Sequence, residues 1–174
     1  MEDALMLVGV LADTHDRLPA IAEFTKRFRE AGVGLVLHAG DFCASWSLRP
    51  IIAANLALAG VYGRNDGDRE GLRAEAAKGM GTELYEGPHS VEVNGSRILL
   101  VHDIGDVGDR SVSGHAVVIH GYTHKCRRDV TGDTLLLNPG EACGWLYGTP
   151  GAALLDLDTK DVTFITLEGE QWRW

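Results

Sequence analysis

Four short stretches of the chain place aspartate or histidine directly after an apolar, strand-like run. They are Asp13-Thr14-His15, Gly40-Asp41, Val101-His102-Asp103 and Gly121-Tyr122-Thr123-His124. Aspartate is a poor strand residue, and a carboxylate is rarely buried unless it is paired or bound to a metal. Carboxylate oxygens mixed with imidazole nitrogens suit Mn, Fe, Zn or Ni better than a structural cysteine-rich zinc site. The sequence therefore predicts a divalent-metal centre built from these four stretches.

The segments that must position these residues alternate between strand-like and helix-like patterns in the first half of the chain. The second half is rich in strands, and Asn94-Gly95 is a strong two-residue hairpin signal. Early βαβ units followed by hairpins predict an α/β fold, a layered β-sandwich of two mixed sheets flanked by helices. Side chains at the ends of such strands converge at one edge of a sheet. The expected strands are residues 5–12, 33–39, 57–62, 84–85, 90–93, 97–101, 116–119, 134–137, 152–156 and 162–166, and the expected helices are 19–31, 48–55 and 68–80.

Length and composition fit a soluble globular protein. The 174 residues are most simply one domain over 1–174, with 45% hydrophobic and 24% charged residues. The net charge of −9 argues against binding to a nucleic-acid backbone and requires local positive charge for any phosphate substrate. Three cysteines give no disulfide framework. With no basic leader and no membrane-length apolar run, the expectation is a cytoplasmic protein without membrane contact.

The order of the motifs resembles the calcineurin-like metallophosphoesterases, and within them the branch of small archaeal and bacterial phosphodiesterases. The resemblance runs from Leu5 to about Leu167. It is carried by the four stretches above together with Gly63-Arg64-Asn65-Asp66 and Asn138-Pro139-Gly140.

This resemblance implies two adjacent divalent metals. The first metal would be held by Asp13, His15, Asp41 and His124, which are all present. The second would share Asp41 and take His102, but its other two ligand positions are changed. Arg64 stands where the family has asparagine, and Tyr122 stands where it has histidine. The expectation is one complete metal site and a depleted second site.

Arg64, Asn65 and Tyr122 are the candidate catalytic residues around that second site. A guanidinium cannot ligate a cation, but its charge and its fork of donors fit phosphate or carboxylate oxygens. Arg64 is therefore expected to pair with Asp41 or to hold a substrate phosphate. A small backbone shift would instead bring Asn65 into the ligand position. In related branches the residue at position 65 acts near the leaving group, where Asn65 could hydrogen-bond but could not serve as a general acid. Tyr122 could donate a hydrogen bond to the same phosphate.

The predicted function is hydrolysis of a small phosphodiester by metal-activated water. The alternative is a binding scaffold, because the phosphoesterase-like subunit of the eukaryotic retromer coat resembles this chain in size and in its Thr-His-Lys and Asn-Pro-Gly segments. The resemblance also makes a homodimer plausible.

Three further features are open at this stage. Arg127 and Arg128 are expected in a solvated turn, with orientation of an anion as the alternative. The glycine-rich stretch Ile104–Gly114 is either a mobile loop near the site or a plain connection. The tail Trp172-Arg173-Trp174 either packs on the domain or contributes to self-association.

Overall fold

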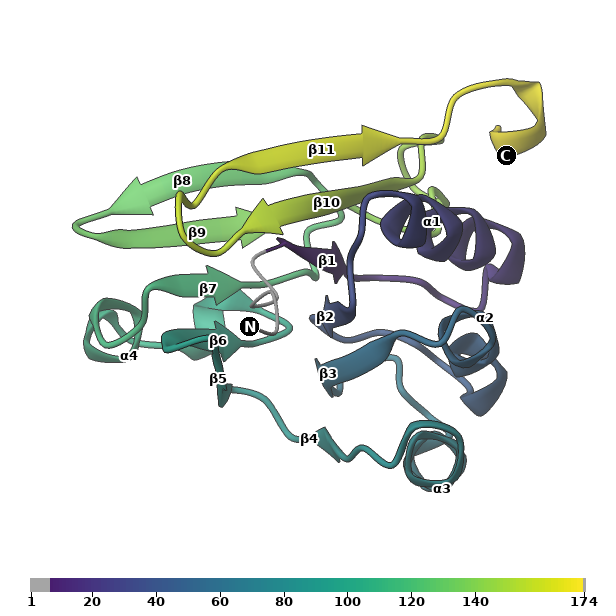
Figure 1. Ribbon diagram of the computed structural model, residues 1–174, viewed down its shortest axis with the longest axis horizontal. Coiled ribbons are helices and arrows are strands. Elements are labelled where there is room, and N and C mark those ends of the chain that lie inside the picture. Colours follow the sequence, from purple (N-terminus) through teal and green to yellow (C-terminus); the bar gives the residue numbers. More distant parts are fainter. Residues whose placement is uncertain (1–6, 174) are drawn as a thin grey trace.

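Two mixed β-sheets stack face to face in the computed structural model, which describes residues 7–173 (Figure 1). The start of the first expected strand and Trp174 lie outside the described residues. The first sheet has the order β11 (Val162–Thr166), β10 (Gly151–Asp156), β1 (Leu7–Leu11), β2 (Leu35–His38), β3 (Ala57–Val61) and β4 (Leu84–Tyr85). The second has the order β5 (His89–Val93), β6 (Ser96–Leu100), β7 (Val117–Ile119), β9 (Thr134–Asn138) and β8 (Arg127–Thr131). The predicted sandwich of two mixed sheets is confirmed.

β1 lies near the centre of the first sheet, parallel to β2 and antiparallel to β10. Its near-continuous apolar sequence fits this place, because both of its faces are covered. Val8 and Val10 point into the core between the two sheets, and Leu11 lies in the core beneath the helices.

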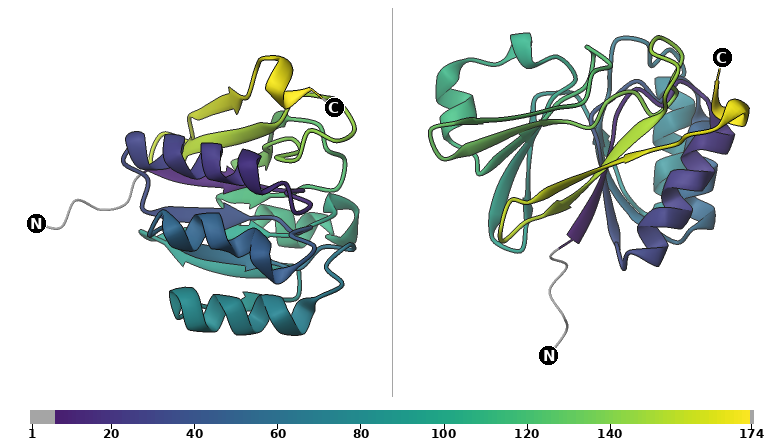
Figure 2. Two further views of the ribbon diagram at one scale, coloured as in Figure 1. Left: turned by 90° about the vertical axis from the view of Figure 1, so that its right-hand side faces the viewer. Right: turned by 90° about the horizontal axis from the view of Figure 1, so that it is seen from above.

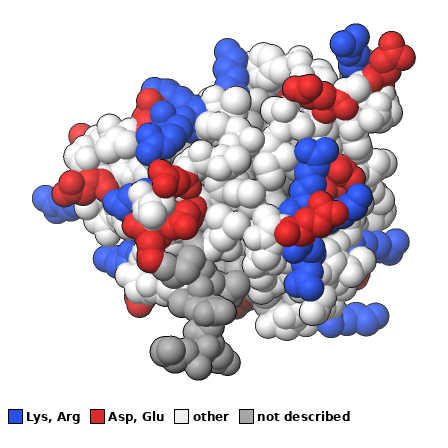
Figure 3. Space-filling view, turned by 45° about the horizontal axis from the view of Figure 1, so that its top comes forward, with Lys and Arg blue, Asp and Glu red and all other residues white. Residues whose placement is uncertain are grey.

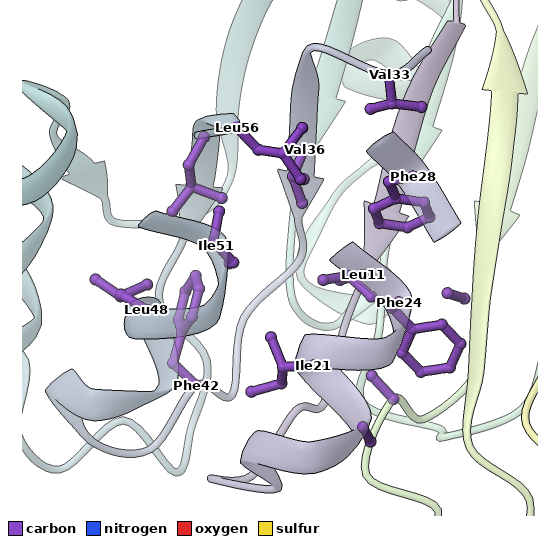
Figure 4. Close-up of a cluster of buried hydrophobic side chains, with 14 of the residues drawn as sticks. Leu11, Ile21, Phe24, Phe28, Val33, Val36, Phe42, Leu48, Ile51 and Leu56 are labelled. Atoms are coloured by element: carbon purple, nitrogen blue, oxygen red, sulfur yellow. The ribbon is translucent and has the colours of Figure 1, made fainter. Parts of the chain in front are cut away.

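Three helices cover the outer face of the first sheet: α1 (Leu18–Glu30), α2 (Arg49–Ala53) and α3 (Arg69–Met80) (Figure 2). In α1, Ile21, Phe24 and Phe28 are fully buried on the face turned to the strands (Figure 4). A Cβ atom at Gly9 would come within 2.6 Å of the Phe28 ring, so glycine in β1 allows this close packing.

The ends of α3 agree with the sequence signals. The Asp68 side chain accepts a hydrogen bond from the Gly71 N–H, and Gly81 ends the helix in the left-handed conformation. The helix expected over 48–55 begins as a 3₁₀ turn, η1 (Ser45–Leu48), and continues as α2.

The expectation of a solvated turn at Arg127 and Arg128 was wrong. Both residues begin β8, an edge strand that pairs antiparallel with β9. Their side chains are exposed, and hydrogen bonding to β9, which a polar sequence does not reveal, makes this segment a strand.

The glycine-rich connection and the tail also contain regular structure. The connection holds η2 (Ile104–Asp106) and α4 (Asp109–Ser113), and the tail holds η3 (Glu170–Trp172). Trp172 packs against the core beneath the helices, and its carbonyl accepts a hydrogen bond from Arg17. Within residues 7–173, no helix has the length and apolar character needed to cross a membrane.

Candidate metal centre

The loops that follow β1, β2, β3, β6 and β7 meet at one place, and the Asn-Pro-Gly turn after β9 packs against the last of them. Backbone hydrogen bonds join them: the Asp13 N–H donates to the Gly40 carbonyl at 3.0 Å, and the Gly121 N–H donates to the His102 carbonyl at 3.0 Å. Several residues of these loops have positive φ angles, which is rare outside glycine and concentrates at functional sites. They include Asp13, His15, Asp41, Tyr122 and His124, together with Asp16 and Cys43.

Asp13, His15, Asp41 and His124 form a compact set of potential metal ligands. One ligand atom from each residue lies within 4.8 Å of those of the other three. His124 Nε2 is 3.4 Å from Asp13 Oδ1, and His15 Nε2 is 3.4 Å from Asp41 Oδ2. The structure therefore brings together the four side chains that the sequence assigns to the first metal.

The chemistry of this set fits a divalent cation. Asp13 is fully buried, yet neither of its carboxylate oxygens has a hydrogen-bond partner among the described residues, and His15 Nε2 also lacks one. Buried polar atoms are almost always hydrogen-bonded, so unpartnered acceptors that face one another require another explanation. Burial raises the pKa of Asp13 to about 7, against the opposing effect of His124. A bound cation would satisfy these atoms and favour the carboxylate form.

His102 approaches the same carboxylates from the second sheet. Its Nδ1–H donates to the Ala39 carbonyl at 2.8 Å, so its Nε2 presents a lone pair to the centre. That Nε2 lies 3.3 Å from Asp41 Oδ2 and has no hydrogen-bond partner among the described residues. His102 therefore lies on the Asp41 side of the centre, where the sequence places the second metal.

Asn65, and not Arg64, contacts Asp41. The Asn65 Nδ2 and backbone N–H each donate to an Asp41 carboxylate oxygen at 2.8 Å. Arg64 instead donates to Asp103 Oδ2 at 2.7 Å, and its guanidinium lies 4.3 Å from the centre of the Tyr122 ring. The turn requires Gly63, because a Cβ atom there would come within 2.2 Å of Asp41 Oδ1. The structure thus places Asn65 beside Asp41, as a hydrogen-bond donor, and it does not form the expected Arg64–Asp41 pair. A ligand role for Asn65 stays a prediction.

Asp66 holds the loops after β2 and β3 together. Its carboxylate accepts hydrogen bonds from the backbone N–H groups of Gly63 at 2.6 Å, Cys43 at 2.7 Å and Asp41 at 3.2 Å. It thereby fixes the orientation of Asp41 without facing the centre.

Asn138 holds the loop after β7 against the Asn-Pro-Gly turn. Its Nδ2 donates to the Gly121 carbonyl at 2.9 Å and to Thr123 Oγ1 at 3.1 Å. The Gly140 N–H donates to its Oδ1 at 3.0 Å, which closes the turn of the Asn-Pro-Gly segment.

Glu141 belongs to the site although no sequence motif indicated it. Its side chain is buried, and its Oε2 lies 2.7 Å from His124 Nδ1. The carboxylate also accepts hydrogen bonds from the backbone N–H groups of Leu146 and Tyr147. Because Glu141 engages Nδ1, His124 is held with Nε2 toward Asp13. The position of Glu141 directly after Asn-Pro-Gly was the available signal.

His38 links two of the ligand loops from beneath. The Gly40 N–H donates to its Nδ1, so its Nε2–H donates to Thr14 Oγ1 at 3.1 Å. The Thr14 hydroxyl donates in turn to the Asp41 carbonyl at 3.3 Å. Complete burial lowers the pKa of His38 to about 3, so this imidazole is neutral.

Comparison with known proteins agrees with this geometry. Residues 6–160 match the calcineurin-like phosphoesterase superfamily domain. The chain is 33% identical over 167 residues to phosphodiesterase MJ0936 of Methanocaldococcus jannaschii, covering 94% of this chain and 100% of that protein. A solved structure described as a novel archaeal phosphodiesterase superposes with a TM-score of 0.87 at 31% identity, over 93% of this chain and 100% of that one.

A more distant structure shares the fold. Vps29 of Entamoeba histolytica in complex with zinc has a TM-score of 0.64 at 22% identity, over 93% of this chain and 98% of that one. The predicted family and fold class are thus confirmed by the family match and by close structural similarity. The chain belongs to the calcineurin-like phosphoesterase superfamily.

Proposed function

We propose that the protein is a divalent-metal-dependent phosphodiesterase that hydrolyses a small phosphodiester. The observation that carries this proposal is the buried Asp13 carboxylate, whose unpartnered oxygens face imidazole nitrogens that are also free to bind a metal. The names given to the curated relative and to the solved structure, each above 30% identity, support a diester as the substrate class.

The first metal would be held by Asp13, His15, Asp41 and His124, with Mn, Ni, Fe or Zn as the candidate ions. When bound, a divalent ion supplies Lewis acidity to a phosphoryl oxygen and lowers the pKa of a water molecule toward ~7. The remaining side chains hold the ligands in place and bind the substrate.

A second metal would find a reduced set of ligands. Asp41, Asn65 and His102 lie together, but Tyr122 provides no imidazole. To bind an ion, the Asn65 amide would rotate by half a turn, so that its oxygen takes the place of its nitrogen. We therefore infer one tight metal site and one weak one, and the expectation of a depleted second site rests on Tyr122.

Arg64 provides positive charge at the rim of the centre. Its side chain is half exposed and is held over the Tyr122 ring by Asp103. On substrate binding, the guanidinium would donate to the non-bridging phosphate oxygens in a bidentate fashion. A diester carries one negative charge, which suits a site with one arginine and a depleted second metal.

The distribution of surface charge supports a small substrate. On the face shown in Figure 3, acidic and basic side chains lie next to one another in mixed groups beside an uncharged area, and the described residues there form no continuous basic surface. Binding to a nucleic-acid backbone normally depends on such a surface. Cytoplasmic location and a homodimer stay predictions.

The test is hydrolysis of bis(p-nitrophenyl) phosphate by metal-stripped protein, with Mn²⁺ or Ni²⁺ added back. Restored turnover that is lost in Asp13→Asn and retained in the surface control Asp158→Asn is the expected result. Absence of turnover in every metal, in protein shown by circular dichroism to be folded, would reject the proposal. It would favour the alternative, a binding scaffold of the same fold.

A further inference from the structure

A pocket opens beside the metal centre. Its volume of about 340 Å³ is within the usual size range of ligand pockets. Its walls come from the loop after β7, the Asn-Pro-Gly turn, the loop before β10, and the strands β10 and β11. The lining residues are His124, Lys125, Cys126, Pro139, Gly140, Glu141, Tyr147, Thr149, Gly151, Phe164 and Thr166.

The pocket shares two residues with the metal centre. His124 belongs to the metal-ligand set and also lines the pocket, and so does Glu141, which holds His124 in place. The pocket therefore begins one side chain away from the position where a substrate phosphorus would bind. The pocket is thus the cavity into which a substituent on that phosphorus would extend past His124.

The walls of the pocket have the chemistry of an aromatic binding site. Tyr147 and Phe164 are 55% and 38% exposed, which is high for large apolar side chains in a folded protein. Lys125 Nζ lies 5.4 Å from the centre of the Tyr147 ring, so the pocket carries a positive charge next to an aromatic surface. The carboxylate of Glu141 is already engaged by His124 and by two backbone N–H groups.

We propose that this pocket binds a planar aromatic substituent of the phosphodiester substrate, such as an aryl group or a nucleobase. The proposal rests on the proposed function, because it places the phosphate at the metal centre. The ring would lie between Tyr147 and Phe164, and Lys125 would face the anionic part of the substrate.

Two non-hydrolysable probes test this proposal by direct binding. Phenylphosphonate and methylphosphonate carry the same anionic group and differ in the organic group. Isothermal titration calorimetry on Mn²⁺-loaded protein should show that phenylphosphonate binds about 10-fold tighter or more, because its ring is removed from water. Equal affinities would overturn the pocket proposal and leave the proposed function intact. Failure of both probes to bind would overturn this proposal as well, and the turnover of bis(p-nitrophenyl) phosphate decides the proposed function separately.

Variants of the pocket residues test whether the preference for phenylphosphonate over methylphosphonate arises in this pocket. Phe164→Ala and Tyr147→Ala should each reduce the advantage of phenylphosphonate and leave the affinity for methylphosphonate unchanged. Leu146→Ala is the matched control, because Leu146 is 68% exposed and adjacent to Tyr147 but does not line the pocket. A preference for phenylphosphonate that survives both pocket variants would overturn the proposal.

The exposed thiol of Cys126 gives an independent measurement in the unaltered protein. Cys126 lines the pocket, whereas Cys143 is buried. Saturating phenylphosphonate should slow alkylation of Cys126 by N-ethylmaleimide at least several-fold, as followed by peptide mass spectrometry, and methylphosphonate should not. Equal alkylation rates with the two probes would contradict binding of the ring in this pocket.

Discussion

The Asn65 side chain lies 2.8 Å from the Asp41 carboxylate, whereas the adjacent Arg64 is bonded to Asp103. This relationship separates the roles of two neighbouring residues. In the proposal above, Asn65 shares a second metal with Asp41, and Arg64 binds the substrate phosphate at the rim of the centre. The proposed depletion of the second site therefore depends on Tyr122.

Tyr122→His should raise the number of tightly bound ions from about one to about two per chain. The introduced imidazole would complete a set with Asp41, Asn65 and His102, and imidazole is a far better ligand than a neutral phenol. Metal content after dialysis, measured by inductively coupled plasma mass spectrometry, checks this. Val130→His, at an exposed residue of β8 outside the ligand set, is the control. Two tightly bound ions in the unaltered protein would contradict the depleted second site.

Arg64→Ala should raise KM for an aryl phosphodiester about 10-fold and change kcat less. The reason is that a hydrogen-bonded charge pair with the bound phosphate would be lost while the metal ligands remain. Steady-state kinetics on metal-loaded protein measures both constants. Arg128→Ala removes an exposed arginine from β8 and should leave KM unchanged. An Arg64→Ala variant with normal KM would show that this guanidinium does not contact substrate.

Glu141→Gln should weaken binding of Mn²⁺ about 10-fold or more. The amide keeps the shape of the side chain and an acceptor for the backbone N–H groups, but it loses the charge that orients His124. Calorimetric titration of metal-stripped protein gives the affinity directly. The exposed Glu92 offers a matched control, since Glu92→Gln should bind the metal normally. An unchanged affinity of Glu141→Gln for Mn²⁺ would show that Glu141 stabilises its loop and does not affect metal binding.

His38 should make the metal-free protein sensitive to acid. Because burial lowers the pKa of His38 in the folded state to about 3, the unfolded chain takes up this proton first. The stabilising contribution is present above pH 6.5 and is lost as the pH falls from 6.5 toward 3. Between pH 6 and 4, the free energy of unfolding of the unaltered protein should fall by roughly 1 kcal/mol per pH unit more than that of His38→Gln. Denaturant titrations at several pH values measure this difference, and parallel pH profiles would contradict it.

Much of the fold could be predicted because local patterns agree with the tertiary structure. The apolar run of β1, the amphipathic face of α1 and the Asn94-Gly95 hairpin each define their element locally. β8 could not be predicted in this way. Its polar residues carry no period-two pattern, and only its pairing with β9 makes it a strand.

The sequence by itself determined the fold class, and it predicted that the motif side chains would meet, because each follows an apolar strand and such strands end at one edge of a sheet. The assignment of Asp13, His15, Asp41 and His124 to a first metal came from the family resemblance and stays a prediction. The tertiary structure decided which residue of the Gly63–Asp66 turn faces Asp41, since hydrogen bonds from Gly63 and Cys43 to Asp66 set the direction of that turn. It also decided the partner of His124. Glu141 is 17 residues away in the chain, and only the packing of the two loops brings their side chains into contact.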